Sequence, residues 1–236
     1  MSRIRIAALL AVALAAVVLG GCHSAPDGEG TGGGLASGGR AGLTSGTVDL
    51  GSVEVKEYQG KQLGSINDFR ENSIKGPQRV DRATYRLKVV GEVSEPQTLT
   101  YQQVLELQPA EKLVTLNCVE GWSVDILWKG VRLTELLEQA GYDRNAKVVV
   151  FRCADGYSTS LPLDYVIGRD LLLAYQMNGL ELPPERGFPF QVVAEDKLGY
   201  KWAKWVTSIE VSNDTRFRGY WESRGYSNDA KLPGAE

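Results

Sequence analysis

Two cysteines are the side chains of this 236-residue sequence best suited to chemistry. Cys118 and Cys153 each end an apolar run, and each is followed by a polar loop that contains glycine, V-E-G-W in one case and A-D-G-Y in the other. Ligand-binding and catalytic groups concentrate on loops of this kind at strand ends. Three interpretations remain open at this point: a functional thiolate, a disulfide between the two cysteines, or two inert buried thiols.

The remaining composition excludes several other chemistries. The single histidine, His23, precedes the part of the chain that has the composition of a folded domain. Catalytic Ser-His-Asp or Cys-His groups and histidine-ligated metals are therefore excluded, and two thiolates alone make a poor zinc site. The sequence also lacks a haem motif and the cysteine spacing of an iron–sulfur cluster. Residues 22–236 carry 24 basic and 29 acidic side chains, a net charge of −5, so we expect no nucleic-acid partner.

The first 22 residues resemble a bacterial lipoprotein signal. Two arginines precede an apolar run from Ile6 to Val18, which is shorter than the ~20 residues of a membrane span. Leu19-Gly20-Gly21-Cys22 then resembles a lipoprotein box. We expect residues 1–21 to be removed and Cys22 to be acylated. The alternative is an ordinary secretory signal with an incidental cysteine.

This interpretation defines the expected domains and location. Residues 22–47 are rich in glycine and serine and lack apolar periodicity, so we expect a flexible tether. Residues 48–236 would form one domain, exported and lipid-anchored to a membrane on its extracytoplasmic side.

Apolar patterning predicts an α+β fold. Strands are predicted over 85–90, 113–118, 147–153, 170–177, 190–194 and 202–211. A capping box beginning at Thr100 predicts a short helix that ends before Pro109. A second helix is predicted over 131–140, capped by Gly141, with a helical turn over 164–167 and a tight turn at Asn178-Gly179. The order of elements lacks a regular βαβ rhythm.

Several segments together resemble a known family. C-V-E-G-W-S at 118–123, followed by W-K-G at 128–130, resembles the molybdenum-ligand segment of the sulfite oxidase-like molybdopterin enzymes. The similarity is nearest to the branch that contains the periplasmic methionine sulfoxide reductase catalytic subunit. Further segments resemble the family in the same order: N-D-F-R-E at 67–71, L-P-P-E-R-G-F-P-F-Q-V-V at 182–193, L-G-Y-K-W-A-K-W-V at 198–206 and the aromatic tail from 219 to 226. The resemblance implies a sulfite oxidase catalytic-domain-like fold, which is a mixed β-sheet fold with short helices.

The resemblance also implies a cofactor and roles for particular residues. The cofactor would be mono-pterin molybdopterin, and Cys118 would be the catalytic residue and the only protein ligand of molybdenum, where a soft thiolate suits the metal. The other cofactor-binding positions would be Asn67, Arg70, Glu71, Cys153, Arg186, Gln191, Trp202, Ala203 and Lys204. The last three would meet the phosphate end of the cofactor. A solvated strand face is the alternative for Lys201 and Lys204, and core packing is the alternative for Trp202 and Trp205.

Three departures from the family bear on the substrate. Arg186 stands where the reductase branch has asparagine, and Gln191 stands where that branch has arginine. Cys118 lacks the basic residues that follow the cysteine of sulfite oxidases. The dianion sulfite would need such positive charge, so we expect a small neutral oxo-substrate such as a sulfoxide or an N-oxide.

The resemblance implies two-electron oxygen-atom transfer, with electrons exchanged with a separate electron-transfer protein. The alternative is a cofactor-free lipoprotein of the same fold that acts as a binding or structural module. It arises because Arg3-Ile4-Arg5 is not a twin arginine, and a chain exported unfolded cannot carry a pterin inserted in the cytoplasm. A disulfide between Cys118 and Cys153 is expected only under this alternative, because a bridged sulfur is not available to a metal.

Overall fold

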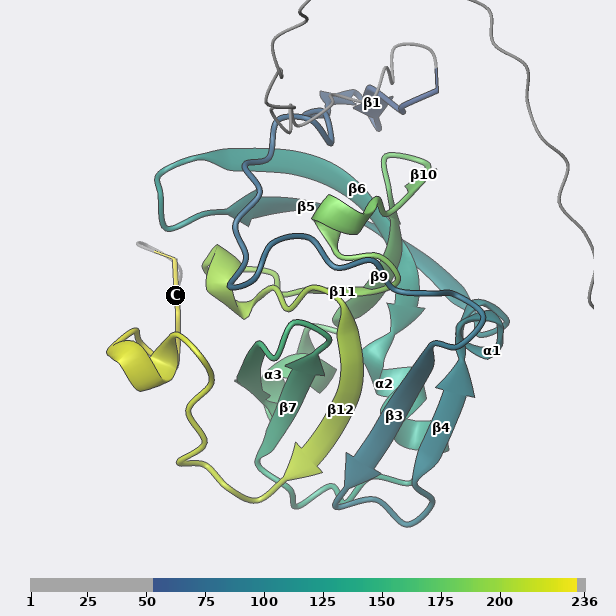
Figure 1. Ribbon diagram of the computed structural model, residues 1–236, viewed down its shortest axis with the longest axis vertical. Helices are drawn as coiled ribbons and strands as arrows, with labels where there is room; N and C mark the ends of the chain where they lie inside the picture. The colour runs from purple at the N-terminus through teal and green to yellow at the C-terminus, as the bar shows by residue number, and fades with distance from the viewer. Residues whose placement is uncertain (1–52, 233–236) are drawn as a thin grey trace, which may run out of the picture. The chain divides into compact units, whose positions relative to one another are not determined.

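Most of the regular structure is β-sheet. The structure is a computed structural model that describes residues 53–232, and Figure 1 shows its two main sheets. The first sheet has the order β10-β9-β6-β5, with β11 also paired to β9. Its strands are β5 (Pro109–Asn117), β6 (Ser123–Arg132), β9 (Leu172–Met177), β10 (Leu180–Glu181) and β11 (Gln191–Val193).

The second sheet has the order β4-β3-β12-β7-β8. Its strands are β3 (Arg86–Gly91), β4 (Gln97–Thr100), β7 (Val148–Cys153), β8 (Ser158–Pro162) and β12 (Val206–Ser212). The pairing of β12 with β3 is parallel and the other pairings in this sheet are antiparallel. The sheet is therefore mixed, as predicted.

The helices are short, and the remaining strands form a hairpin. The hairpin consists of β1 (Glu57–Tyr58) and β2 (Lys61–Gln62). The α-helices are α1 (Tyr101–Leu105), α2 (Leu133–Gln139) and α3 (Leu163–Gly168). Single 3-10 turns are η1 (Pro184–Arg186), η2 (Gly199–Lys201) and η3 (Glu222–Arg224). No helix among residues 53–232 is long and apolar enough to span a membrane.

The hydrophobic core draws on both sheets. Trp128 of β6 is fully buried, and its ring lies 5.5 Å from that of Trp202, which follows η2. Phe151 of β7 and Ile209 of β12 are also fully buried. Because aromatic side chains bury large apolar areas, the contact between Trp128 and Trp202 helps to fix the segment around Trp202 against the first sheet.

Several local predictions are confirmed. Thr100 and Gln103 form the capping box that begins α1. Asn178 and Gly179 have φ angles of 47° and 80°, the left-handed pair that a tight hairpin turn requires.

Other predictions are wrong at particular residues. The strand predicted over 113–118 begins earlier, at Pro109, and residues 131 and 132 belong to β6 rather than to a helix. The strand predicted over 202–211 begins only at Val206, because the φ angle of 53° at Trp205 is incompatible with extended backbone. The signal, Cys22 and the tether lie outside the described residues.

Two irregular segments flank the sheets. In Figure 1 the segment that follows β2 passes between the two sheets on the visible face before it enters β3. The C-terminal tail after β12 lies along the left edge. The first segment spans residues 63–85 and the second follows Ser212. Irregular segments of this length in a compact domain are usually functional.

Candidate functional site

Cys118 begins the tight turn that joins β5 to β6. Its backbone N–H donates to the carbonyl of Trp122 at 2.9 Å, and the N–H of Gly121 donates to the carbonyl of Cys118 at 3.2 Å. Gly121 has a φ of 84°, a left-handed conformation that glycine adopts without strain. The turn places the half-buried Cys118 thiol at the end of the first sheet.

Cys153 begins a turn of the same form at the end of the second sheet. Its backbone N–H donates to the carbonyl of Tyr157 at 3.0 Å, and the N–H of Gly156 donates to the carbonyl of Cys153 at 3.1 Å. Gly156 has a φ of 87°. The two cysteines are followed by similar residues in the sequence because each begins the same type of turn. Both thiols are free in the structure.

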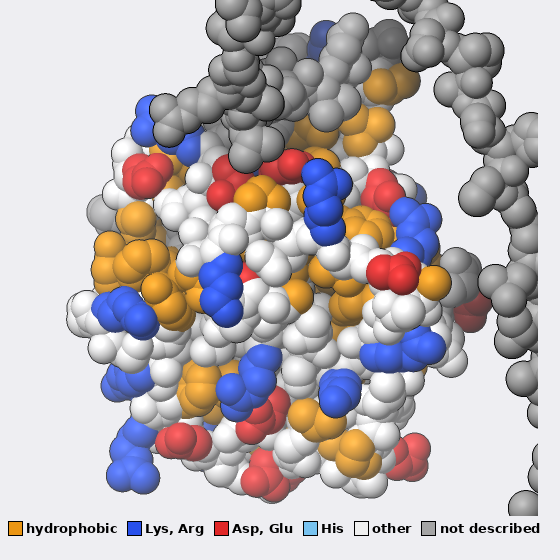
Figure 2. Space-filling model, in the orientation of Figure 1, with side chains coloured by type: hydrophobic (Ala, Val, Ile, Leu, Met, Phe, Trp, Pro, Cys, Tyr) orange, Lys and Arg blue, Asp and Glu red, His pale blue; other side chains and the backbone are white. Residues whose placement is uncertain are grey.

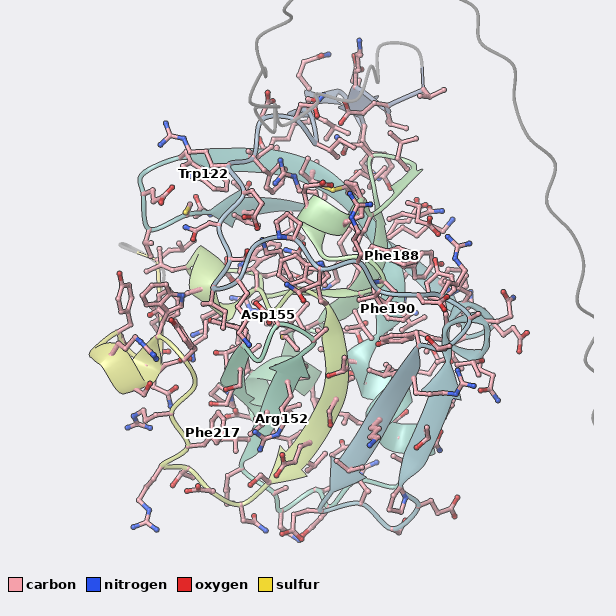
Figure 3. All side chains as sticks on the ribbon, in the orientation of Figure 1. Trp122, Arg152, Asp155, Phe188, Phe190 and Phe217 are labelled. Atoms are coloured by element: carbon pink, nitrogen blue, oxygen red, sulfur yellow. The ribbon has the colours of Figure 1, made fainter. Side chains whose placement is uncertain are left out.

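A cavity of about 290 Å³ lies beside Cys118, close to the lower end of the range for small-molecule sites. It is called the Cys118 cavity below. Its lining residues come from 69–74, 116–122, 155–157, 185–191, 199–205 and 221–226. Figure 3 shows Trp122 at the end of the β5–β6 hairpin and Asp155 beyond β7, so both sheets contribute to the site.

The structure brings together six of the ten residues that the sequence assigned to the cofactor. Those that line the Cys118 cavity are Arg70, Cys118, Arg186, Gln191, Trp202 and Lys204. The other four are Asn67, Glu71, Cys153 and Ala203. Asn67 is exposed, Glu71 pairs with Lys204, and Ala203 is fully buried with its carbonyl bonded to the N–H of Val192.

The two thiols have different surroundings. Burial raises the pKa of the Cys118 thiol, and backbone N–H groups of the turn and the charge of Arg70 oppose that rise. Burial raises the pKa of Cys153 well above its usual value, and the nearby Asp155 carboxylate adds to the effect. Cys153 is 7% exposed and does not line the cavity. Of the two cysteines, the geometry makes Cys118 the one available to a ligand.

Cationic and polar groups occupy one part of the cavity wall. Lys204 forms an ion pair with Glu71 at 2.9 Å, and burial lowers its pKa although Glu71 opposes that shift. The Arg186 guanidinium donates to the backbone carbonyls of Ile66 at 3.0 Å and Phe69 at 2.7 Å. Arg186 therefore anchors the segment that precedes β3 as well as lining the cavity. The buried hydroxyl of Ser73, also in the lining, has no hydrogen-bond partner.

The alternative of a solvated strand face is wrong for Lys201. Its side chain is fully buried, donates to the carbonyl of Ser160 at 3.0 Å and is paired with the buried carboxylate of Glu222. Trp202 is 4% exposed and Trp205 is 1% exposed, so core packing is correct for both. Both side chains also contribute to the cavity wall.

Sequence reasoning missed several residues of the cavity. Ser73, Asp155, Tyr157, Trp221 and Tyr226 line it, and no role had been assigned to them. The glycine turn after Cys153 was a usable signal for Asp155 and Tyr157, because it repeats the turn after Cys118. Ser73 and the two tail aromatics have no comparable local signal.

Comparison with known proteins gives the family. Residues 74–221 match the model of the oxidoreductase molybdopterin binding domain, and the chain belongs to that family. The resemblance to the sulfite oxidase-like molybdopterin enzymes is thus confirmed. The protein is an oxidoreductase whose cofactor is molybdopterin.

Particular relatives show the extent of the similarity. The chain is 36% identical over 151 residues to the uncharacterized oxidoreductase YuiH of Bacillus subtilis, covering 64% of this chain and 76% of YuiH. It is 37% identical over 148 residues to the putative protein-methionine-sulfoxide reductase subunit YedZ1 of Azospira oryzae, covering 63% and 56%. The sulfane dehydrogenase SoxCD of Paracoccus pantotrophus shares the fold, with a TM-score of 0.56 and 24% identity over 59% of this chain and 41% of that one.

The residues of the Cys118 cavity fit molybdopterin. The described residues contain no group of three or more His, Cys, Asp and Glu side chains able to hold a metal ion. A metal beside Cys118 would therefore depend on the pterin's own sulfurs for its remaining ligands, which matches a single soft thiolate. The unpaired Ser73 hydroxyl, the Gln191 amide and the Lys204 ammonium suit a group that carries amides and a phosphate.

Proposed function

We propose that the protein transfers an oxygen atom in a two-electron reaction, with a small neutral oxo-substrate such as a sulfoxide or an N-oxide. For a sulfoxide the balanced reaction is R2SO + 2 e− + 2 H+ → R2S + H2O. The observation that carries the proposal is the placement of Cys118, a free and half-buried thiol on the wall of a cavity built from both sheets. The similarity to a protein described as a methionine-sulfoxide reductase subunit supports the same class of substrate.

The charges of the Cys118 cavity favour a neutral substrate. Three basic residues, Arg70, Arg186 and Lys204, line it. Three acidic residues, Glu120, Asp155 and Glu185, line it as well. A cofactor that carries a phosphate adds negative charge to this balanced set. A dianion such as sulfite would then meet no excess of positive charge to attract it.

The cofactor and the residues of the Cys118 cavity would have different roles in the reaction. The bound cofactor supplies the two-electron redox change. Cys118 would hold the metal, and Gln191, Ser73 and Lys204 would bind the polar parts of the pterin. Trp202 lines the cavity and would keep water from its inner wall, which would strengthen polar interactions inside the cavity.

We also propose a separate electron-transfer protein as partner. The sequence lacks a haem motif and the cysteine spacing of an iron–sulfur cluster, so the electrons must enter or leave through another molecule. A small substrate would enter through the cavity mouth. A redox protein would need only to come close enough to the cofactor for electron transfer.

The proposal is tested with the full chain loaded with molybdenum cofactor and supplied with a chemical reductant. We expect reduction of dimethyl sulfoxide or trimethylamine N-oxide and no oxidation of sulfite. Metal analysis and a free-thiol count on the same sample establish the loading. Absence of turnover with any oxo-donor, at about one molybdenum per chain, would contradict the proposal. Absence of both metal and free thiols would instead favour the cofactor-free binding module.

The lipid anchor is a separate proposal with its own test. Replacing Cys22 by alanine removes the only thiol of the lipoprotein box, so the protein should move from the membrane fraction to the soluble fraction. Mass spectrometry should show the loss of acyl chains. His23→Ala, one position further on, is the matched control and should remain in the membrane. A Cys22→Ala protein that stays membrane-bound at the mass of the wild-type protein would refute the lipoprotein assignment.

A further inference from the structure

Aromatic side chains from η2 and the C-terminal tail form one side of the mouth of the Cys118 cavity. Tyr200, Trp221 and Tyr226 all line the cavity, and we call these three residues the aromatic wall. The ring centroids of Trp221 and Tyr226 are 5.2 Å apart, and those of Tyr200 and Tyr226 are 5.3 Å apart. Figure 2 shows hydrophobic side chains gathered along the left edge of the visible face, where Figure 1 draws the tail.

Exposed apolar side chains are concentrated at this mouth. Among residues 53–232 the exposed large hydrophobic side chains are Val53, Val119 and Tyr226. Val119 is 45% exposed and Tyr226 is 42% exposed, and both line the Cys118 cavity. Apolar surface that remains exposed in a concave site commonly marks the place where a ligand is bound.

The aromatic wall is held in place before any ligand arrives. The Tyr200 hydroxyl donates to the carbonyl of Ser227 at 2.7 Å, and the N–H of Tyr226 donates to the carbonyl of Trp221 at 3.2 Å. The buried pair of Lys201 and Glu222 joins the same two segments. A rigid aromatic surface loses little entropy when it binds a ligand.

The side of the mouth formed by the β5–β6 turn also carries apolar side chains. Trp122 is half-buried, and Phe69 packs edge-on against it with ring centroids 5.8 Å apart. Val119 belongs to the same turn. Burial raises the pKa of Tyr200 in the aromatic wall to about 12, so its phenol is uncharged at neutral pH. The turn also carries the exposed Glu120, whose carboxylate accepts a hydrogen bond from the Trp122 indole at 3.1 Å. Apart from this carboxylate, the turn and the tail both present apolar side chains at the mouth.

This apolar mouth does not suit the cofactor. Molybdopterin carries amides and a phosphate, and Ser73, Gln191 and Lys204 provide polar groups for them. The aromatic wall can provide only Tyr hydroxyls and an indole N–H, and the Tyr200 hydroxyl is already bonded to Ser227. The remaining role for an apolar surface beside the reactive thiol is to bind the part of the substrate that does not react.

We propose that the substrate is a sulfoxide or related oxo-compound that carries an aromatic or similarly flat apolar substituent, and that this substituent binds against the aromatic wall. The inference rests on the proposed function and specifies its substrate class. Tyr226 would determine specificity, because its ring is the most exposed part of the wall. Contacts of this kind in an apolar pocket change selectivity by about 10- to 200-fold.

The first test measures binding without chemistry. Methyl phenyl sulfone has the shape of an aryl sulfoxide and is not expected to turn over, and the tryptophans at the mouth report its binding by fluorescence. On cofactor-loaded protein we expect Tyr226→Ser to raise the Kd for the sulfone by about 10-fold, because a ring contact is lost. Tyr226→Phe keeps the ring and should restore the wild-type Kd. Phe217→Ser removes a half-buried aromatic of the same tail that does not line the cavity, and should leave the Kd unchanged.

The second test measures selectivity. In wild-type protein, kcat/KM for methyl phenyl sulfoxide should exceed that for dimethyl sulfoxide by about 10-fold or more. Tyr226→Ser should abolish most of this ratio, while Phe217→Ser should keep it. If wild-type protein fails to bind the sulfone, or if Tyr226→Ser matches wild-type protein in both Kd and selectivity, the aromatic wall is not a substrate site. If the sulfone binds through Tyr226 and no sulfoxide is reduced, the aromatic wall is a binding site but the proposed reaction is wrong.

Discussion

Cys118→Ala is expected to leave a folded protein that contains less molybdenum than the wild-type protein. The thiol lies on the surface of a tight turn rather than in the core, so its removal should barely change the free energy of unfolding. The described residues contain no cluster of His, Cys, Asp or Glu side chains that could replace the thiol, so the metal would be held through the pterin alone. Loss of outer-shell partners alone costs about 10- to 100-fold in metal affinity or activity, so we expect the loss of the proposed protein ligand to weaken metal binding at least as much. Elemental analysis of the purified full chain measures it directly.

Cys153→Ala is the matched control for this experiment. Cys153 occupies the same position in a turn of the same form, but its side chain is buried and does not line the cavity. We expect the Cys153→Ala protein to retain its molybdenum and to show a lower melting temperature, because a buried side chain is truncated. Equal molybdenum contents in the two variants would contradict the assignment of Cys118 as the metal ligand.

The features that were predictable from sequence are those with local causes. The capping box at Thr100 and the left-handed pair at Asn178 and Gly179 depend on residues within a few positions of each other. The two cysteine turns also depend on nearby residues, because each needs a glycine three positions after the cysteine. Turn chemistry of this kind is specified by short stretches of sequence.

Strand β6 was missed because its burial does not alternate. Six of its ten residues are apolar or glycine, and Ile126, Leu127 and Trp128 are buried in succession. A strand that is covered on both faces loses the period-two pattern and cannot be distinguished from a helix by periodicity. The helix α2 follows directly, so the predicted helix begins two residues before the observed one.

The cavity was only partly predictable because its walls come from distant parts of the chain. The matching family segments located Cys118, Arg186, Gln191, Trp202 and Lys204. They could not show that Arg186 would bind the backbone of the segment before β3, since that contact joins residues 117 and 120 positions apart. The aromatic wall likewise depends on where the tail returns to the cavity, and no local pattern specifies that return.

Lys201→Met is expected to destabilise the protein by about 3–5 kcal/mol, because it leaves a buried carboxylate without its cation. The side chains of Lys201 and Glu222 are fully buried. One Glu222 oxygen accepts from Lys201 and from Thr159, and the other oxygen is buried without a partner. Lys147→Met, at an exposed lysine before β7, is the control and should change the free energy of unfolding by less than about 0.5 kcal/mol. Urea denaturation measures both variants.

A double substitution tests whether the unpaired buried charge is what destabilises the single variant. Lys201→Met with Glu222→Leu removes both charges and fills similar volumes, and such replacements are often neutral or stabilising. We therefore expect the double variant to be more stable than either single variant. The aromatic wall gives a second readout, since Trp221 is adjacent to Glu222 and Tyr200 is adjacent to Lys201. If the ion pair also fixes the position of the wall, the double variant should regain stability and still bind methyl phenyl sulfone more weakly than wild-type protein. A double variant no more stable than Lys201→Met would show that burial of an unpaired charge is not what destabilises the single variant.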